Sequence, residues 1–223
     1  MTRRTRLAAA VVVLMAGCGH PPQHGPEASG RATPSSHINP ANIGRVRGAM
    51  PPDYEVGGLT GVSSPAALWG LHGAWTADPP PCAVLADPLG ERAGTARGVS
   101  GSGPGGLSYA VVAASTTGPV TLDRGRLGEC PHWTITQGRT TARVQVIDPP
   151  RIDGADTVGL ASAISTFVEG GTQITSRADT FTAYLGDYYA FTAVVADPGA
   201  PHPALGAGFA ADLLKKTVSA LRS

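Results

Sequence analysis

Residues 180–195 read TFTAYLGDYYAFTAVV, and this stretch decides the fold of the chain. Two runs rich in β-branched and aromatic residues flank the pair Gly186-Asp187. A two-residue connection that begins with glycine matches a tight hairpin turn, because glycine readily adopts the positive φ that such turns require. The stretch therefore predicts an antiparallel hairpin with strands over residues 180–185 and 188–195.

A second hairpin is predicted over residues 133–147, where the runs WTITQ and TTARVQVI flank Gly138-Arg139. In the second run, apolar residues at positions 142, 144 and 146 alternate with Arg143 and Gln145. Such alternation predicts a strand with one covered face and one face in contact with water. Further strands are expected over residues 107–115 and, more briefly, 54–56.

The glycine-rich residues 94–106 are predicted to form a flexible loop. They contain the pattern G-x-G-x-x-G from Gly101 to Gly106. This pattern cradles phosphates when a strand precedes it and a helix follows it. Here a strand-like run, LSYAVVAAS, follows instead. The pattern therefore does not predict a nucleotide site.

Four helices are predicted. Asn39-Pro40 is a typical N-cap and first-turn proline, and Asp78 precedes a short helix that runs to residue 86. The third helix is expected over residues 157–169, where apolar residues recur at helical spacing before Gly170-Gly171. The fourth, over residues 205–221, is amphipathic. Residues 64–75 are expected to be irregular or strand-like. The pattern as a whole predicts a single α+β domain, an antiparallel sheet with helices packed on it.

The N-terminus has the features of a bacterial lipoprotein signal. Basic residues come first, an apolar run over residues 7–15 follows, and the sequence LMAGC ends at Cys18. We expect residues 1–17 to be a signal peptide, Cys18 to carry the lipid, residues 18–37 to be a Pro/Gly/Ser tether, and residues 38–223 to form the domain. This places the protein on the extracytoplasmic side of the cell membrane. The alternatives are an ordinary signal peptide or an uncut N-terminal anchor.

The charge of the chain argues against a nucleic-acid partner. The 17 Lys and Arg residues fall to 14 once Arg3, Arg4 and Arg6 leave with the signal, against 16 Asp and Glu. The remaining basic residues form no cluster that could follow a phosphate backbone. The expected partners are instead the membrane, through the lipid on Cys18, and an envelope molecule.

Two cysteines remain once Cys18 is assigned to lipid. In an oxidising compartment Cys82 and Cys130 are expected to form one disulfide. The alternative is two unpaired, buried cysteines.

Several motifs resemble those of small mycobacterial lipoproteins related to the extracellular sensor domain of PknH-type Ser/Thr kinases. They are INPANIGRVRG, DPPPC, GECPHWT, DGADTVGLASAIS and FTAYLGDYYAFTAVV, together with the lipobox. The resemblance spans residues 38–221 and implies an antiparallel sheet with helices around a cleft, and a role in sensing or ligand binding. Sensors of this type have two disulfides, whereas this chain can form only one.

The sequence contains no motif that predicts catalysis. A Gly-x-Ser-x-Gly nucleophile elbow is absent, and the nearest run, around Ser100, departs from it at the last position. The histidines at positions 72, 132 and 202 have no metal-binding spacing, so neither a metal nor a cofactor is predicted. We expect a protein that is not an enzyme. An envelope hydrolase is the weakest alternative.

Large aromatic residues offer the best candidates for a ligand cleft. They are Trp69, Trp75, Trp133 and Tyr188. Aromatic side chains commonly line apolar ligand sites, although they also fill cores. The function expected from the sequence is non-catalytic binding of an apolar or amphipathic envelope ligand. The alternative is an interaction module for an envelope protein.

Overall fold

The computed structural model describes residues 37–199 and 203–223. The predicted signal peptide, Cys18 and nearly all of the predicted tether therefore lie outside the described residues. Within those two ranges, no helix is long and apolar enough to cross a membrane.

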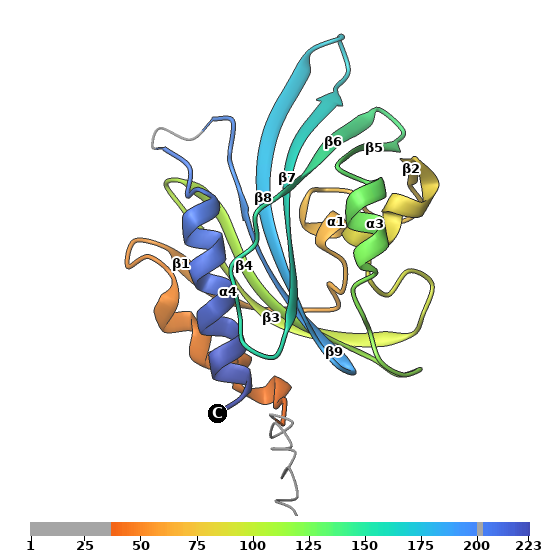
Figure 1. The fold of residues 1–223 in the computed structure, drawn as a ribbon. Helices are drawn as coiled ribbons and strands as arrows, with labels where there is room; N and C mark the ends of the chain where they lie inside the picture. Colours follow the sequence, from red (N-terminus) through yellow and green to blue (C-terminus); the bar gives the residue numbers. More distant parts are fainter. Residues whose placement is uncertain (1–36, 200–202) are drawn as a thin grey trace, which may run out of the picture. The chain divides into compact units, whose positions relative to one another are not determined.

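Nine strands form one antiparallel sheet in the order β1-β3-β4-β9-β8-β7-β6-β5-β2 (Figure 1). Their bounds are Glu55–Thr60 (β1), Thr76–Asp78 (β2), Gly94–Gly103 (β3), Gly106–Ser115 (β4), His132–Gln137 (β5), Thr140–Ile147 (β6), Asp156–Phe167 (β7), Gln173–Leu185 (β8) and Tyr188–Val195 (β9). Both predicted hairpins are present, as β5–β6 and β8–β9. Their turns contain Gly138 at φ 54° and Gly186 at φ 77°, the region that favours glycine.

Residues 156–167 form strand β7, so the predicted helix over 157–169 is wrong. The run also fits a strand, because Val158, Leu160 and Ile164 alternate onto one buried face. β7 pairs along its whole length with β8 and along most of it with β6. This pairing outweighs the helical spacing, as tertiary context commonly does. The glycines expected to stop the helix, Gly170 and Gly171, lie instead between β7 and β8, at φ 87° and 79°.

Strand β3 occupies the region predicted to be a flexible loop. A Cβ atom on Gly101 would lie 3.1 Å from the Tyr54 ring and 3.3 Å from the sulfur of Met50. At Gly98 it would lie 2.5 Å from the Ala110 carbonyl oxygen. Glycine at these positions therefore allows neighbouring atoms to approach β3 closely. In this run glycine indicates close packing of a strand, not a flexible loop.

Each face of the sheet carries its own core cluster. One face packs against α1 (Pro65–Leu68), α2 (Ala83–Ala86), α3 (Arg124–Glu129) and the 3-10 helix η2 (Pro80–Cys82). The other packs against the 3-10 helix η1 (Pro40–Ala49) and α4 (Ala207–Leu221). The amphipathic C-terminal helix is confirmed, with Leu213, Leu214 and Val218 buried. The segment 64–75, expected to be irregular or strand-like, begins with the helical turn α1.

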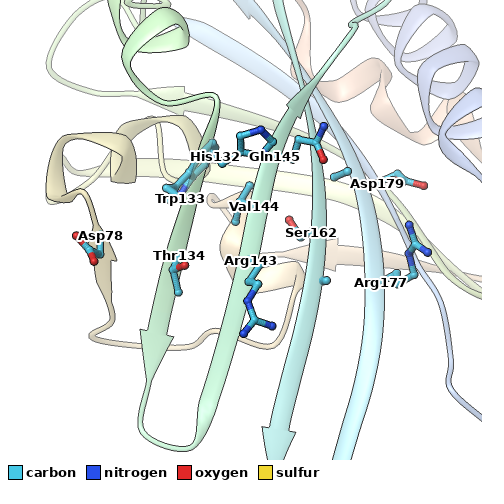
Figure 2. A pocket seen from close by; sticks show the side chains of 12 residues that line it. Asp78, His132, Trp133, Thr134, Arg143, Val144, Gln145, Ser162, Arg177 and Asp179 are labelled. Atoms are coloured by element: carbon cyan, nitrogen blue, oxygen red, sulfur yellow. The ribbon is translucent and has the colours of Figure 1, made fainter.

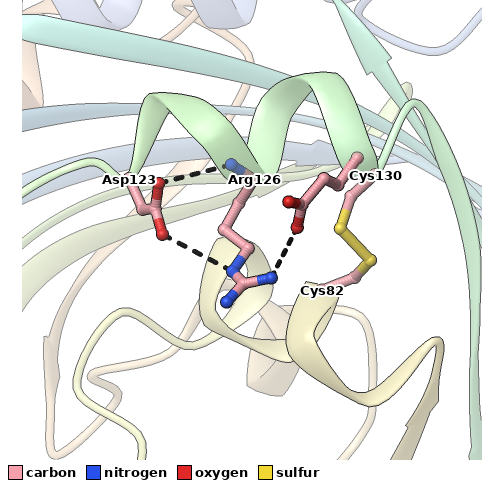
Figure 3. The surroundings of a disulfide bond; sticks show 5 residues. Cys82, Asp123, Arg126 and Cys130 are labelled. Atoms are coloured by element: carbon pink, nitrogen blue, oxygen red, sulfur yellow. Dashed lines mark hydrogen bonds and ion pairs between the residues drawn. A yellow bond between two sulfur atoms is a disulfide. The ribbon is translucent and has the colours of Figure 1, made fainter.

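The expected disulfide joins Cys82 of η2 to Cys130, which follows α3, at a Cα–Cα distance of 5.7 Å (Figure 3). The helix α3 was not predicted. Asp123 caps it by accepting from the Gly125 N–H at 2.9 Å, and Arg126 pairs with Asp123 at 3.4 Å and with Glu129 at 2.5 Å. The disulfide thus connects the short helices that cover one face of the sheet. The predicted α+β class with a single disulfide is confirmed.

Candidate functional site

Part of the sheet on the α4 side carries exposed side chains over β2, β5, β6, β7 and the start of β8, and we call it the open face. Strand alternation creates it. Trp133, Ile135 and Val144 point into the core beneath, so their neighbours along the same strands point outward. α4 packs on β4, β8 and β9, farther along the same side of the sheet.

The strand register arranges the open face in transverse rows (Figure 2). The first row runs across five strands through Asp78, Thr134, Arg143, Ala163 and Arg177. The second runs across four strands through His132, Gln145, Ala161 and Asp179. Residues paired directly across neighbouring strands share a face, so each row is a line of adjacent side chains.

A hollow of about 470 Å³ lies over these two rows. Ala161 and Ala163 stand at its centre, and their small side chains leave the space that the longer neighbours enclose. Its volume falls within the range of about 300–1,000 Å³ that is usual for ligand sites. The lining comes from strands in one sheet, so its parts are held at fixed spacings.

Two arginines flank the centre of the hollow. Arg143 and Arg177 pair with Ala163 from opposite sides, so their Cα atoms lie two strand spacings apart, ~10 Å. Both are exposed, and neither forms an ion pair within the part of the chain that the structure describes. Each arginine offers a fork of hydrogen-bond donors, and two of them on either side of an alanine can reach the same guest.

Asp179 is the acidic residue nearest to these two arginines, and it also interacts with the first turn of α4. Burial raises the pKa of its carboxyl, while Arg177 and the backbone N–H of Ala207 act in the opposite direction. Ala207 is the first residue of α4, whose N-cap, Gly206, has no side chain to accept from that turn. Asp179 therefore supports the start of the helix, where a negative charge is favourable. Figure 2 shows the Arg177 guanidinium extending toward Asp179, whereas the Arg143 guanidinium extends along β6 and away from Asp179.

The four aromatic residues predicted for a cleft do not come together. Trp69 is buried, and its Nε1 donates to the Thr180 hydroxyl at 3.0 Å. Trp75 packs at the border of the same core. Trp133 is buried in that core as well, but it borders the hollow. Tyr188 packs against the other core cluster, on the α4 side of the sheet. Only Trp133 of the four lines the hollow.

Sequence reasoning did not select Arg143 or Arg177 as site residues. The alternation in residues 140–147 placed Arg143 and Gln145 on the wetter face, and the structure confirms this. Arg177 could not be paired with them, because its strand was predicted to begin only at residue 180. In residues 37–199 and 203–223, no three His, Cys, Asp or Glu side chains are grouped as metal ligands would be.

A family model described as "Domain of unknown function (DUF5642)" matches residues 39–222. The chain belongs to this family. The fold of this DUF5642 protein is similar to that of an uncharacterized protein of Mycobacterium smegmatis, the Rv0999 ortholog. That structure gives a TM-score of 0.64 at 21% identity, over 85% of this chain and 100% of that one.

The extracellular domain of PknH from Mycobacterium tuberculosis gives a TM-score of 0.45 at 15% identity, over 82% of this chain and 92% of that one. No curated protein matches the chain.

Proposed function

We propose that this DUF5642 protein is a lipid-anchored, extracytoplasmic binding protein whose domain holds a ligand on the open face without catalysing a reaction. The observation that carries the proposal is the hollow of about 470 Å³ lined by two rows of side chains from adjacent strands. Polar groups that converge on a preformed concavity are the usual marks of a ligand site.

The scaffold suits binding with little rearrangement. The lining side chains rise from paired strands, and the same strands bury their other side chains in the core. The backbone positions of the lining residues are therefore set before a guest arrives, which reduces the entropy lost on binding. A sensor-like role needs such a preformed site, because signalling requires a defined bound state.

The extracytoplasmic location is supported by the disulfide between Cys82 and Cys130, since such bonds persist in oxidising compartments. The lipid on Cys18 is a separate part of the proposal. Replacing Cys18 with Ala should move the protein from the detergent phase to the aqueous phase after Triton X-114 partitioning of cells. Unchanged partitioning would rule out the lipid anchor and leave the binding proposal standing.

Native mass spectrometry of the protein purified gently from cell envelopes tests the binding proposal. We expect a population with additional mass that organic extraction removes, together with a thermal midpoint that rises when the extract is returned. A protein that is fully guest-free, and whose midpoint does not respond to envelope extract, would contradict the proposal.

A second candidate function is an interaction module for an envelope protein. The observation in its favour is the end of the β7–β8 hairpin, which extends past its neighbours at the top of Figure 1. Phe167, Val168 and Ile174 there are 51%, 37% and 47% exposed. Cross-linking from this end on intact cells should yield one discrete partner, and only diffuse adducts would remove the candidate.

A further inference from the structure

The open face changes in chemistry along the strands, from charge through hydroxyl groups to an apolar end. Beyond the arginine row, the register places Thr76, Thr136, Thr141, Ser165 and Thr175 in a third row. All five are exposed or half-buried. Two pairs farther along, and so on the same face, Phe167 stands opposite Gln173. Rows with three different chemistries thus follow one another along the hairpin.

Phe167 belongs to the same face as the arginines. It follows Ala161, Ala163 and Ser165 at every second position of β7, so its ring lies on the open side of the hairpin. It stands four positions beyond Ala163 in extended chain, a span of ~13 Å. The ring is 51% exposed, so it is accessible to a guest on this face.

The charges around the hollow favour an anion. Of the five ionisable residues that line it, Asp78 lies at the sheet edge, two strands from Arg143, and His132 lies in the neighbouring row. Asp179 supports the first turn of α4, as described above. The two arginines on either side of Ala163 therefore supply the positive charge nearest the centre. Arginine forks bind phosphate and carboxylate oxygens in pairs, with charge-assisted hydrogen bonds.

We propose that the open face binds an anionic lipid, with its headgroup oxyanion bridged by Arg143 and Arg177 above Ala163. The glycerol and ester oxygens meet the hydroxyl row, and the first part of the acyl chain covers Phe167. This proposal rests on the proposed function, and it assigns the ligand class of the same site. The span of ~13 Å between the arginine row and Phe167 suits an amphiphile and exceeds the size of a free phosphate ion.

Binding of soluble short-chain phospholipids tests the assignment. Dihexanoyl phosphatidylglycerol, dihexanoyl phosphatidylcholine and inorganic phosphate would be titrated into the intact protein by calorimetry. We expect phosphatidylglycerol to bind well, phosphatidylcholine at least about tenfold more weakly, and phosphate without measurable competition, since each charged hydrogen bond contributes enough for about a tenfold change.

Matched variants locate the site. Arg143→Gln with Arg177→Gln should weaken phosphatidylglycerol binding at least about tenfold. Arg97→Gln with Arg151→Gln removes the same charge at two exposed arginines outside the hollow and should leave the affinity unchanged. Phe167→Ser should weaken binding, whereas Ile174→Ser should not. Ile174 is similarly exposed, at 47%, but pairs with Thr166 on the opposite face. Unchanged thermal midpoints would establish that every variant is folded.

Each other outcome overturns the assignment. Equal binding of phosphatidylcholine, or equal loss in both arginine pairs, would show that Arg143 and Arg177 do not select the anion. Phosphate competition at similar affinity would reduce the site to an ion site. Equal loss with Phe167→Ser and Ile174→Ser would indicate docking of the whole hairpin end. If no lipid binds while native mass spectrometry still finds a guest, the lipid assignment fails and the binding function survives.

Discussion

The disulfide should contribute a large part of the stability of this domain. Cys82 and Cys130 are 48 residues apart in sequence, and the loop that they close contains β3, β4 and α3. Cross-linking a loop of that length removes ~14 cal/mol/K of entropy from the unfolded chain, which corresponds to about 4 kcal/mol at 25 °C. For a domain of this size, with an unfolding entropy of ~0.4 kcal/mol/K, the thermal midpoint should fall by about 10 °C without the bond.

The test is the double variant Cys82→Ala with Cys130→Ala. Both cysteines are fully buried, so alanine avoids the unpaired hydroxyl that serine would place in the core. Urea denaturation and calorimetry should show a loss of about 4 kcal/mol, with the slope against urea rising as the unfolded chain becomes more expanded. Reduction of the wild type should reproduce the shift, and the same reductant should not affect the variant.

A fall in the midpoint of less than ~2 °C would refute this reasoning, since it would mean that the constraint on the unfolded chain is offset elsewhere. A shift that the reductant also causes in the double variant would point to damage by the reductant rather than to loss of the bond.

Three further predictions concern the sheet and its cores. Gly159→Ala should lower the free energy of unfolding by about 1–3 kcal/mol, because its Cβ would lie 2.7 Å from the Phe181 ring and 2.8 Å from the Ile147 carbonyl oxygen. A stabilisation would instead favour a helix at this position. Trp69→Phe should cost about 1–3 kcal/mol by leaving the buried Thr180 hydroxyl without its donor, and Trp75→Phe, at the border of the core, should cost less. Burial raises the pKa of Tyr184 and Tyr189, so the unfolded chain releases these protons near pH ~10 while the folded chain retains them. The free energy of unfolding should therefore fall above pH ~10, by up to about 1.4 kcal/mol per pH unit for each tyrosine. Absorbance at 295 nm should show both ionising together with unfolding, and reversible ionisation in the folded protein would contradict this.

The hairpins and the C-terminal helix could be predicted because their signals are local. Gly186 and Gly138 mark turns between alternating runs, and the apolar stripe of α4 repeats over several turns. The disulfide followed from a count of cysteines. β7 could not be predicted in the same way, because its apolar residues satisfy both a helical and a strand period. Only the pairing with β6 and β8 decides between them.

The candidate site depends even more on long-range structure. The alternation around Arg143 showed that it faces water, and this was visible in the sequence. The row of Arg143, Ala163 and Arg177 exists only through the register of three strands, and a shift by one residue in any of them would turn its side chain to the other face. The aromatic residues were chosen for their size, which does not distinguish a core position from a cleft.

The sequence by itself thus determined the class of the fold, two hairpins, the last helix and the disulfide pair, because turn residues, periodicity and cysteine number act over short stretches. The prediction of an exported lipoprotein rests on residues outside the described ranges and stays a prediction. Only the tertiary structure decided that β3 and β7 are strands, that Trp69 and Trp133 are buried in the core, and that two distant arginines share a hollow. These depend on which strands become neighbours, and that is set by the packing of the whole sheet.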